Sequence, residues 1–354
     1  MVLMSLDAEK AFDRVNWEFL YKVMGKFGFH QSFIMIIQAL YKSPRAKIKV
    51  HGALSNFFDL QRGTCQGCPF SPPLFVLFIE ALSQSVIQSI NITGVKIMGR
   101  EHKISLFADD ILIYLTNPNI TFPKLFSLLE TFSSLSGYKL NISKTQILTF
   151  NYKPNQEIKS KVNLNWELEQ MKYLGVNITK DLSKIYHANF KPLCYKINED
   201  IKRWNLIPIL NFESRIDTVK MNILPRMLYL FLTLPVEITD KQFQEWDKII
   251  SRFIWQGKRP RIKYQTIQLA KDKGGLGFPC LKDYYVSAQL RILVCWCNVD
   301  YQARWKEIET VASRDFPIQA SLGDVTLIKK QINQGNQWIN LPLKLWLQFL
   351  NKND

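Results

Sequence analysis

Short apolar runs alternate with longer amphipathic stretches in the first half of the chain. Runs rich in Val, Ile, Leu and aromatic residues predict β-strands, and apolar positions three and four residues apart predict helices. The strands expected on this basis are 2–6, 47–50, 57–60, 104–106, 111–115, 145–150 and 171–178, with 47–50 and 57–60 paired around His51-Gly52 and 171–178 as one strand. The helices expected are one that opens at Asp7 and includes Phe12 to Val23, and others at 32–41, 74–90 and 123–135.

Beyond Thr179 the β-rich runs give way to helical patterns with many Trp, Lys and Arg residues. Helices are expected at 186–204, 212–231 and 240–255, with more helix in the rest of the chain. This change of pattern predicts an α+β protein with a mixed N-terminal part and a helical C-terminal part. Four basic residues follow the third of these helices: Lys258, Arg259, Arg261 and Lys263.

The charge of the chain favours a polyanionic partner. Its 354 residues carry a formal net charge of +16, which suits nucleic acid, although a basic protein that is merely well solvated would have the same charge. No apolar run reaches the roughly 18 residues of a membrane helix, and the first residues do not have the layout of a signal peptide. We therefore expect an intracellular protein, in the nucleus or the cytoplasm, that is not secreted and has no membrane partner.

Cys65 and Cys68 form the only cysteine pair with the spacing of a metal or redox motif. No second pair and no histidine cluster completes a zinc site. Because we expect an intracellular protein without a signal peptide, all six cysteines are expected to be reduced thiols.

Two adjacent carboxylates stand between two apolar runs, in the segment Phe107-Ala108-Asp109-Asp110. We interpret the segment as a strand, a tight turn and a second strand, with Asp109 and Asp110 at the tip. An ordinary exposed Asp-Asp turn is the simpler interpretation, because Asp is common in turns. If both carboxylates are desolvated, a cation is needed to offset their charge.

A third carboxylate, Asp7, follows the first predicted strand. A strand end and a neighbouring hairpin tip can meet at one edge of a sheet, so Asp7, Asp109 and Asp110 are expected to converge. Carboxylate oxygens suit Mg²⁺ or Mn²⁺ better than zinc. Two such ions about 4 Å apart could hold the attacking and leaving oxygens of a phosphoryl transfer.

Five sequence blocks carry a more specific signal because of their order. They are Ser5-Leu6-Asp7-Ala8-Glu9-Lys10-Ala11-Phe12-Asp13, Gln66-Gly67-Cys68-Pro69-Phe70-Ser71-Pro72, Phe107-Ala108-Asp109-Asp110, Ser136-Gly137-Tyr138-Lys139-Leu140-Asn141-Ile142-Ser143-Lys144-Thr145 and Lys172-Tyr173-Leu174-Gly175. In this order the chain resembles the reverse transcriptases of LINE-type (non-LTR) retrotransposons, whose motifs A to E the blocks match. The similarity continues past Thr179, through Ile223-Leu224-Pro225 and Phe253-Ile254-Trp255.

The resemblance implies a fold and a division of the chain. Residues 1–180 would form a right-hand polymerase palm, an antiparallel sheet with packed helices. Residues 181–256 would form an all-helical thumb, and residues 257–354 a basic segment followed by a helical extension. The implied activity is RNA-directed DNA polymerisation, with an RNA template, a DNA primer and a deoxynucleoside triphosphate as substrates.

The same resemblance implies roles for residues near motifs A to C. Asp7, Asp109 and Asp110 would be catalytic and would hold two Mg²⁺ ions, with Mn²⁺ as a substitute. The remaining residues of the nucleotide site would be Ala8, through its carbonyl, Phe12 as the steric gate that excludes a 2′-hydroxyl, and Gln66 and Gly67 as the pocket lining.

Further roles fall on the later blocks. Lys144 would be the motif D lysine, a candidate general acid for the leaving pyrophosphate. Tyr173, Leu174 and Gly175 would form the primer grip. The basic face of the thumb, with Lys258, Arg259, Arg261 and Lys263 after it, would follow the nucleic-acid backbone without reading its sequence.

Each of these residues also has a simpler explanation. Phe12 could pack in the core, Gln66-Gly67 could form only a turn, and Lys144 could be one more solvated lysine. The chain differs from the family in that it begins at the motif A strand, without the fingers that hold the triphosphate. We therefore expect a truncated copy with little or no polymerase activity by itself.

Two other functions remain open at this point. One is a catalytically inactive nucleic-acid-binding remnant with the same fold. The other is a two-metal nuclease, in which motif B and the Lys144 block would have no purpose. The sequence does not indicate an oligomeric state.

Overall fold

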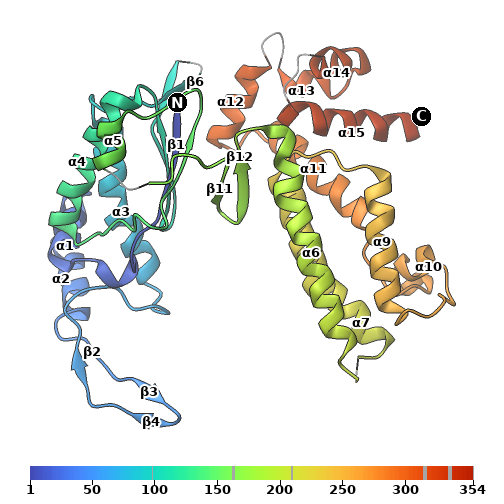
Figure 1. Cartoon of the computed structure of the whole chain (residues 1–354), viewed down its shortest axis with the longest axis horizontal. Helices are drawn as coiled ribbons and strands as arrows, with labels where there is room; N and C mark the ends of the chain where they lie inside the picture. The colour runs from blue at the N-terminus through green and yellow to red at the C-terminus, as the bar shows by residue number, and fades with distance from the viewer. Residues whose placement is uncertain (98, 162–163, 209, 314–316, 334–336, 354) are drawn as a thin grey trace. The chain divides into compact units, whose positions relative to one another are not determined.

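The computed structural model describes residues 1–354 except 98, 162–163, 209, 314–316, 334–336 and 354. The chain forms two compact units, Met1–Asp181 and Leu182–Asp354 (Figure 1). The first unit mixes strands with helices, and the elements described in the second are helices. Within the described ranges, none of the helices is both long enough and apolar enough to cross a membrane.

Four antiparallel strands form the central sheet of the first unit, in the order β10-β1-β9-β8. They are β1 (Val2–Leu6), β8 (Ile104–Phe107), β9 (Asp110–Leu115) and β10 (Gln146–Thr149). Side chains alternate between the two faces of a strand, and both faces of β1 are apolar except at Ser5. The strand is therefore suited to the middle of a sheet that is covered on both sides.

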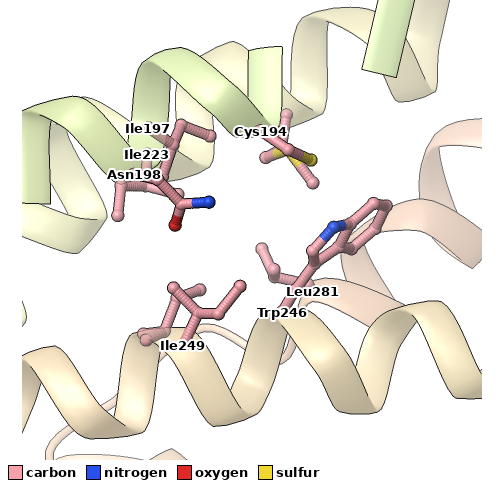
Figure 2. Close-up of a pocket in the computed structure, with 9 residues that line it drawn as sticks. Cys194, Ile197, Asn198, Ile223, Trp246, Ile249 and Leu281 are labelled. Carbon is pink, nitrogen blue, oxygen red and sulfur yellow. The ribbon is translucent and has the colours of Figure 1, made fainter. Parts of the chain in front are cut away.

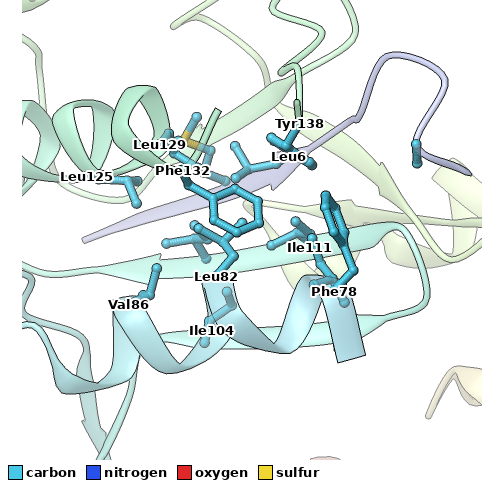
Figure 3. Packing of buried hydrophobic residues seen from close by; sticks show 14 of the residues in the cluster. Leu6, Phe78, Leu82, Val86, Ile104, Ile111, Leu125, Leu129, Phe132 and Tyr138 are labelled. Carbon is cyan, nitrogen blue, oxygen red and sulfur yellow. The ribbon is translucent and has the colours of Figure 1, made fainter. Parts of the chain in front are cut away.

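Helices cover one face of this sheet. The helices of the unit are α1 (Trp17–Lys26), α2 (Gln31–Leu40), α3 (Ser71–Gln88), α4 (Pro118–Ser136) and the short α5 (Gln156–Lys161). Figure 3 shows Leu6 and Ile111 of the sheet packed against Phe78 of α3 and Phe132 of α4. Full burial of one such side chain contributes about 2 kcal/mol, so this layer fixes the sheet firmly.

A hairpin covers the opposite face. Its strands are β11 (Gln170–Tyr173) and β12 (Val176–Thr179), and Met171 packs with Leu3, Leu112 and Leu148 of the sheet. The remaining strands of the unit form three two-stranded pairs. They are β2 (Arg45–Ala46) with β5 (Phe58–Asp59), β3 (Lys49–Val50) with β4 (Ala53–Leu54), and β6 (Val95–Ile97) with β7 (Arg100–His102).

Three predictions for this unit were wrong in detail. The stretch 171–178 is a hairpin rather than one strand, because it turns at Leu174-Gly175. The chain does not enter a helix at Asp7: only a 3₁₀ turn, Phe12–Arg14, precedes α1. The strand that follows His51-Gly52 is Ala53–Leu54, and the predicted strand near 57–60 pairs instead with Arg45–Ala46.

The second unit consists of packed helices. They are α6 (Ile185–Asn205), α7 (Phe212–Thr218), α8 (Leu224–Thr233), α9 (Asp240–Ile254), α10 (Tyr264–Gln268), α11 (Leu281–Cys297), α12 (Arg304–Ala312), α13 (Ile318–Ser321), α14 (Val325–Ile332) and α15 (Gln337–Asn353). The predicted helix at 212–231 contains a π-helical segment, Val219–Ile223. Pro225 has no N–H for the regular helical bond, and the wider turn ends two residues before it.

A small apolar cavity of about 20 Å³ lies inside this second unit. Figure 2 shows Cys194, Ile197 and Ile249 around it, with Trp246 and Leu281 closing one side. The pKa of the Cys194 thiol is raised, chiefly by burial, so the thiol stays protonated. We interpret the cavity as a packing gap between helices.

Candidate active site

Asp7 is held at the end of β1 by the segment that follows α4. Leu6 is paired with Ile111, and beyond it the carbonyl of Asp7 accepts a hydrogen bond of 2.8 Å from the backbone N–H of Asn141. Ala8 forms an isolated bridge with Leu140. These backbone contacts extend the sheet past Leu6, which explains why no helix begins here.

Asp109 and Asp110 occupy the tip of the β8–β9 hairpin. Phe107 pairs with Asp110, so the loop consists of Ala108 and Asp109. Ala108 has a φ of +51°, a left-handed conformation that costs a non-glycine residue about 1 kcal/mol. Asp109 and Asp110 are both exposed, while Ile111 and the two residues after it are buried. The predicted turn is therefore present, and its tip faces solvent.

The three acids lie close enough to influence one another. The pKa of the Asp110 carboxyl is raised, first by partial burial and then by the charges of Asp109 and Asp7. Asp110 as a whole is exposed, so burial affects its carboxyl only in part. Leu6 is opposite Ile111 in the sheet. Asp7 follows Leu6 and Asp110 precedes Ile111, so the two acids lie at the same edge of the sheet.

Two tyrosines complete the surroundings of the acids. Tyr138 is 3% exposed, and its pKa is raised by burial and by the charges of Asp7 and Asp109. Its hydroxyl has no hydrogen-bond partner among the described residues. Burial, Tyr114 and Asp110 raise the pKa of Tyr173 to about 12. A site with three acids and two neutral phenols is electronegative, and a cation would relieve its repulsion.

The donor chemistry of the acids fits Mg²⁺ or Mn²⁺, which prefer carboxylate oxygens. In the part of the chain that the structure describes, no group of three or more His, Cys, Asp or Glu side chains is arranged to hold a metal ion. Asp7, Asp109 and Asp110 are therefore near one another at one edge of the sheet but are not arranged as a ready-made set of metal ligands.

Phe12 begins the 3₁₀ turn Phe12–Arg14 and packs against α3. Its ring stacks on Phe75 of α3 with 4.4 Å between the ring centroids, and it is half-buried. Its carbonyl accepts a hydrogen bond of 2.8 Å from the N–H of Thr64. The segment before motif B is therefore attached directly to Phe12.

Gly63 makes this attachment possible. A Cβ at this position would lie 2.8 Å from the carbonyl oxygen of Asp13. The glycine N–H donates to the carbonyl of Val15 at 2.8 Å, and its own carbonyl accepts from the indole of Trp17 at 2.8 Å. Only a residue without a side chain can approach the chain so closely.

Gln66 and Gly67 form an exposed turn. The N–H of Cys68 donates to the carbonyl of Cys65 at 3.2 Å, and Gly67 has a φ of +88°, which suits the third position of a type II turn. Both cysteines are free thiols. The hydroxyl of Ser71 donates to the carbonyl of Cys65 at 2.7 Å, so the turn is connected to the start of α3.

Lys144 is exposed at the end of the segment that holds Asp7. Its backbone N–H donates to the carbonyl of Asn141 at 3.2 Å, and Asn141 in turn donates to Asp7. Sequence reasoning assigned Asn141 no role, although an Asn followed by Ser143 and Lys144 is a typical turn signal. Sequence reasoning also gave no separate role to Gly63 or Tyr138.

Leu174 and Gly175 form the two-residue loop of the β11–β12 hairpin. Their φ angles of +45° and +79° are those of a type I′ turn. The N–H of Lys172 donates to the side chain of Gln146 in β10 at 2.7 Å. Together with the effect of Asp110 on Tyr173, this contact places the hairpin near the acids.

The basic cluster of Lys258, Arg259, Arg261 and Lys263 lies in the second unit, between α9 and α10. All four residues are exposed. The cluster therefore belongs to a different compact unit from the acids.

Comparison with known proteins identifies relatives. Residues 1–178 match the family model described as reverse transcriptase (RNA-dependent DNA polymerase). The chain is 22% identical over 309 residues to the transposon TX1 uncharacterized 149 kDa protein of Xenopus laevis, a match that covers 86% of this chain and 23% of that protein. It is 24% identical over 304 residues to the Pol polyprotein of the type-2 retrotransposable element R2DM of Drosophila melanogaster, covering 81% and 27%.

A third relative is the Pol polyprotein of the type-1 retrotransposable element R2 of Popillia japonica, 26% identical over 255 residues, covering 71% of this chain and 41% of that protein. The chain thus spans less than half the length of each of these relatives. Among solved structures, it is similar to Candida albicans telomerase in complex with a TWJ fragment of telomeric RNA, with a TM-score of 0.40, 11% identity and coverage of 97% of this chain and 49% of that one. The match to the family model over 1–178 and the transposon relatives confirm the resemblance, and the chain belongs to the reverse transcriptase (RNA-dependent DNA polymerase) family, as a LINE-type (non-LTR) retrotransposon member.

Proposed function

We propose that this chain is the palm and thumb part of an RNA-directed DNA polymerase, with RNA template, DNA primer and deoxynucleoside triphosphate as substrates. The palm is 1–180, the thumb 181–256, and 257–354 is the helical extension. The observation that carries the proposal is the convergence of Asp7 at the end of β1 with Asp109 and Asp110 at the tip of the adjacent hairpin.

Asp7, Asp109 and Asp110 would hold two Mg²⁺ ions, or Mn²⁺, with the carbonyl of Ala8. When bound, the ions would neutralise the phosphate charge and lower the pKa of the attacking primer hydroxyl. The exposed tip leaves Asp109 and Asp110 accessible to a triphosphate, whereas the backbone contacts around Asp7 fix its position. Mg²⁺ commonly takes part of its ligands from phosphates, so a bound triphosphate would supply the ligands that the three acids do not.

The residues around the acids would position the substrates. Phe12 would act as the steric gate, since its ring is fixed on Phe75 and cannot give way to a 2′-hydroxyl. Gln66 and Gly67 would line the nucleotide pocket. Their exposed turn is connected to the Phe12 segment through Thr64 and Gly63, which supports a shared pocket.

The later motifs would act on the leaving group and the primer. Lys144, whose backbone is connected to that of Asp7 through the backbone of Asn141, would donate a proton to the pyrophosphate as it leaves. Tyr173, Leu174 and Gly175 would contact the primer. Lys258, Arg259, Arg261 and Lys263 would bind the phosphate backbone of the nucleic acid.

Primer extension on poly(A)/oligo(dT) with Mg²⁺ tests the proposal. The proposal expects a low rate of extension by this chain alone, which Asp109→Asn reduces by at least about 100-fold because a carboxylate ligand is lost. Asp13→Asn is the matched control, since Asp13 is an exposed acid of motif A to which the proposal gives no role, and it should leave the rate within about twofold.

The inactive remnant is the alternative function. It predicts that the chain binds primer and template with no extension in either Mg²⁺ or Mn²⁺. Extension that is equal in wild type and Asp109→Asn would contradict the assignment of the acids.

A further inference from the structure

A two-stranded ribbon leaves the first unit between α2 and α3. β2 pairs with β5, β3 pairs with β4, and His51 and Gly52 form the loop, with φ angles of +47° and +87°. Figure 1 shows the ribbon extending away from the sheet and beyond α2. Every residue from 47 to 59 is exposed. The exposed side chains are therefore available to a partner. A partner would also stabilise the ribbon, because an isolated two-stranded ribbon is only marginally stable in water.

Two cations of this ribbon lie over one of its aromatic rings, that of Phe57. The guanidinium of Arg45 lies 5.3 Å and the ammonium of Lys47 4.0 Å from the centroid of the Phe57 ring. Phe57 is 61% exposed, and Lys49 is exposed as well. Between 45 and 59 the sequence contains one acidic residue, Asp59. The ribbon is therefore strongly basic around a solvent-facing ring.

This combination is the chemistry of single-stranded nucleic-acid recognition. Phosphates are bound by cations and unpaired bases stack on aromatic rings. A protein partner is disfavoured: covering the exposed Ile48 and Val50 would also desolvate the neighbouring Lys47 and Lys49, at a high cost without paired acids.

We propose that the ribbon is a contact site for a single-stranded RNA segment. Arg45, Lys47 and Lys49 bind consecutive phosphates, and an unpaired base stacks on Phe57. The site extends the proposed polymerase function, on which it rests, because it holds template that is not yet paired with the primer.

The charge contribution is tested with a fluorescein-labelled oligouridylate and the full chain, by fluorescence anisotropy in EDTA at several salt concentrations. The variant is Arg45→Gln with Lys47→Gln and Lys49→Gln. The charge-matched control is Lys22→Gln with Lys26→Gln and Lys124→Gln, three exposed lysines of the same unit.

The slope of log affinity against log salt is negative. Loss of three phosphate contacts should reduce its magnitude by about 2, because each contact to a single strand contributes about 0.7. The control should change the slope by less than about 0.5. Equal changes in the two triple variants would overturn the proposal, because they would show that only the net charge matters. Circular dichroism verifies that both variants are folded.

The stacking contribution is tested with Phe57→Ala against Phe58→Ala, an adjacent exposed phenylalanine. Phe57→Ala should weaken binding of the oligouridylate about tenfold and binding of a duplex of similar length less than twofold. Phe58→Ala should weaken oligouridylate binding by less than about twofold. Equal losses for the two variants, or equal losses on the single strand and the duplex, would overturn the stacking role of Phe57.

The outcome is independent of catalysis because no metal or nucleotide is present. Asp109→Asn should bind the oligouridylate as the wild type does. If the ribbon variants bind like their controls while primer extension still depends on Asp109, the ribbon site is wrong and the polymerase assignment stands. If extension fails while the ribbon variants lose binding, only the polymerase assignment is wrong.

Discussion

The neighbouring acids affect the pKa of the Asp110 carboxyl. Its pKa is raised in the folded chain by partial burial and by Asp109 and Asp7. A raised pKa means that the folded state binds the proton more tightly than the unfolded state. The contribution of Asp110 to stability is therefore favourable at low pH and is lost as the pH rises through its folded pKa.

Asp110→Asn should accordingly raise the free energy of unfolding at pH 7, by less than about 1 kcal/mol because the residue is exposed to solvent screening. This increase in the free energy of unfolding should disappear at pH values below the usual pKa of an aspartate. Urea unfolding of both proteins from pH 3 to pH 8, without divalent ions, measures it. A variant that is less stable than wild type at pH 7 would mean that the carboxyl has favourable contacts, contrary to this account.

Tyr138 is the second residue whose environment makes a sharp prediction. Its hydroxyl is buried, faces the charges of Asp7 and Asp109, and has no partner among the described residues. Removing an unsatisfied buried hydroxyl should not destabilise the fold. Tyr138→Phe should leave the free energy of unfolding unchanged or raise it by about 1 kcal/mol in thermal or urea unfolding. A loss of more than about 1 kcal/mol would show that the hydroxyl is hydrogen-bonded.

Among the elements, the segment before motif B depends on one glycine. Gly63→Ala would place a methyl group 2.8 Å from the carbonyl oxygen of Asp13, at a φ of +92°. Gly67 has a similar φ of +88° with nothing within 4 Å, so Gly67→Ala is the matched control for backbone strain alone. We expect Gly63→Ala to cost about 2 kcal/mol more than the control in urea unfolding, since the clash adds to the strain. Equal losses of unfolding free energy in Gly63→Ala and Gly67→Ala would mean that the segment before motif B can move to accommodate the added methyl group.

Hydrophobic periodicity predicted correctly whether most elements are helices or strands. It was wrong where contacts between residues distant in sequence determine the local structure. The stretch 171–178 has the composition of a single strand, and Leu174 gives no turn signal even though its φ is +45°. The hairpin forms because Met171 packs against Leu3 and Leu148 of the sheet. In the same way, Ala8 pairs with Leu140 instead of opening a helix, and a local pattern cannot indicate a partner so distant in sequence.

For the whole molecule, the order of the five blocks predicted the family, and the family match confirms it. The sequence could not predict the supporting contacts. Arg215 in the second unit is 4% exposed, and its guanidinium donates to the carbonyl of Phe253 at 3.1 Å and to the side chain of Asn205 at 2.6 Å. A basic residue in a basic protein gives no sign that it is buried, because its partners come from separate helices.

The central claim is that Asp7, Asp109 and Asp110 together form a cation site. Titration of Mn²⁺ into the full chain, followed by electron paramagnetic resonance of the free ion, measures this directly. The account predicts that Asp109→Asn weakens Mn²⁺ binding about tenfold or more, whereas Asp13→Asn binds as the wild type does. Identical titration curves for wild type and Asp109→Asn would contradict the account.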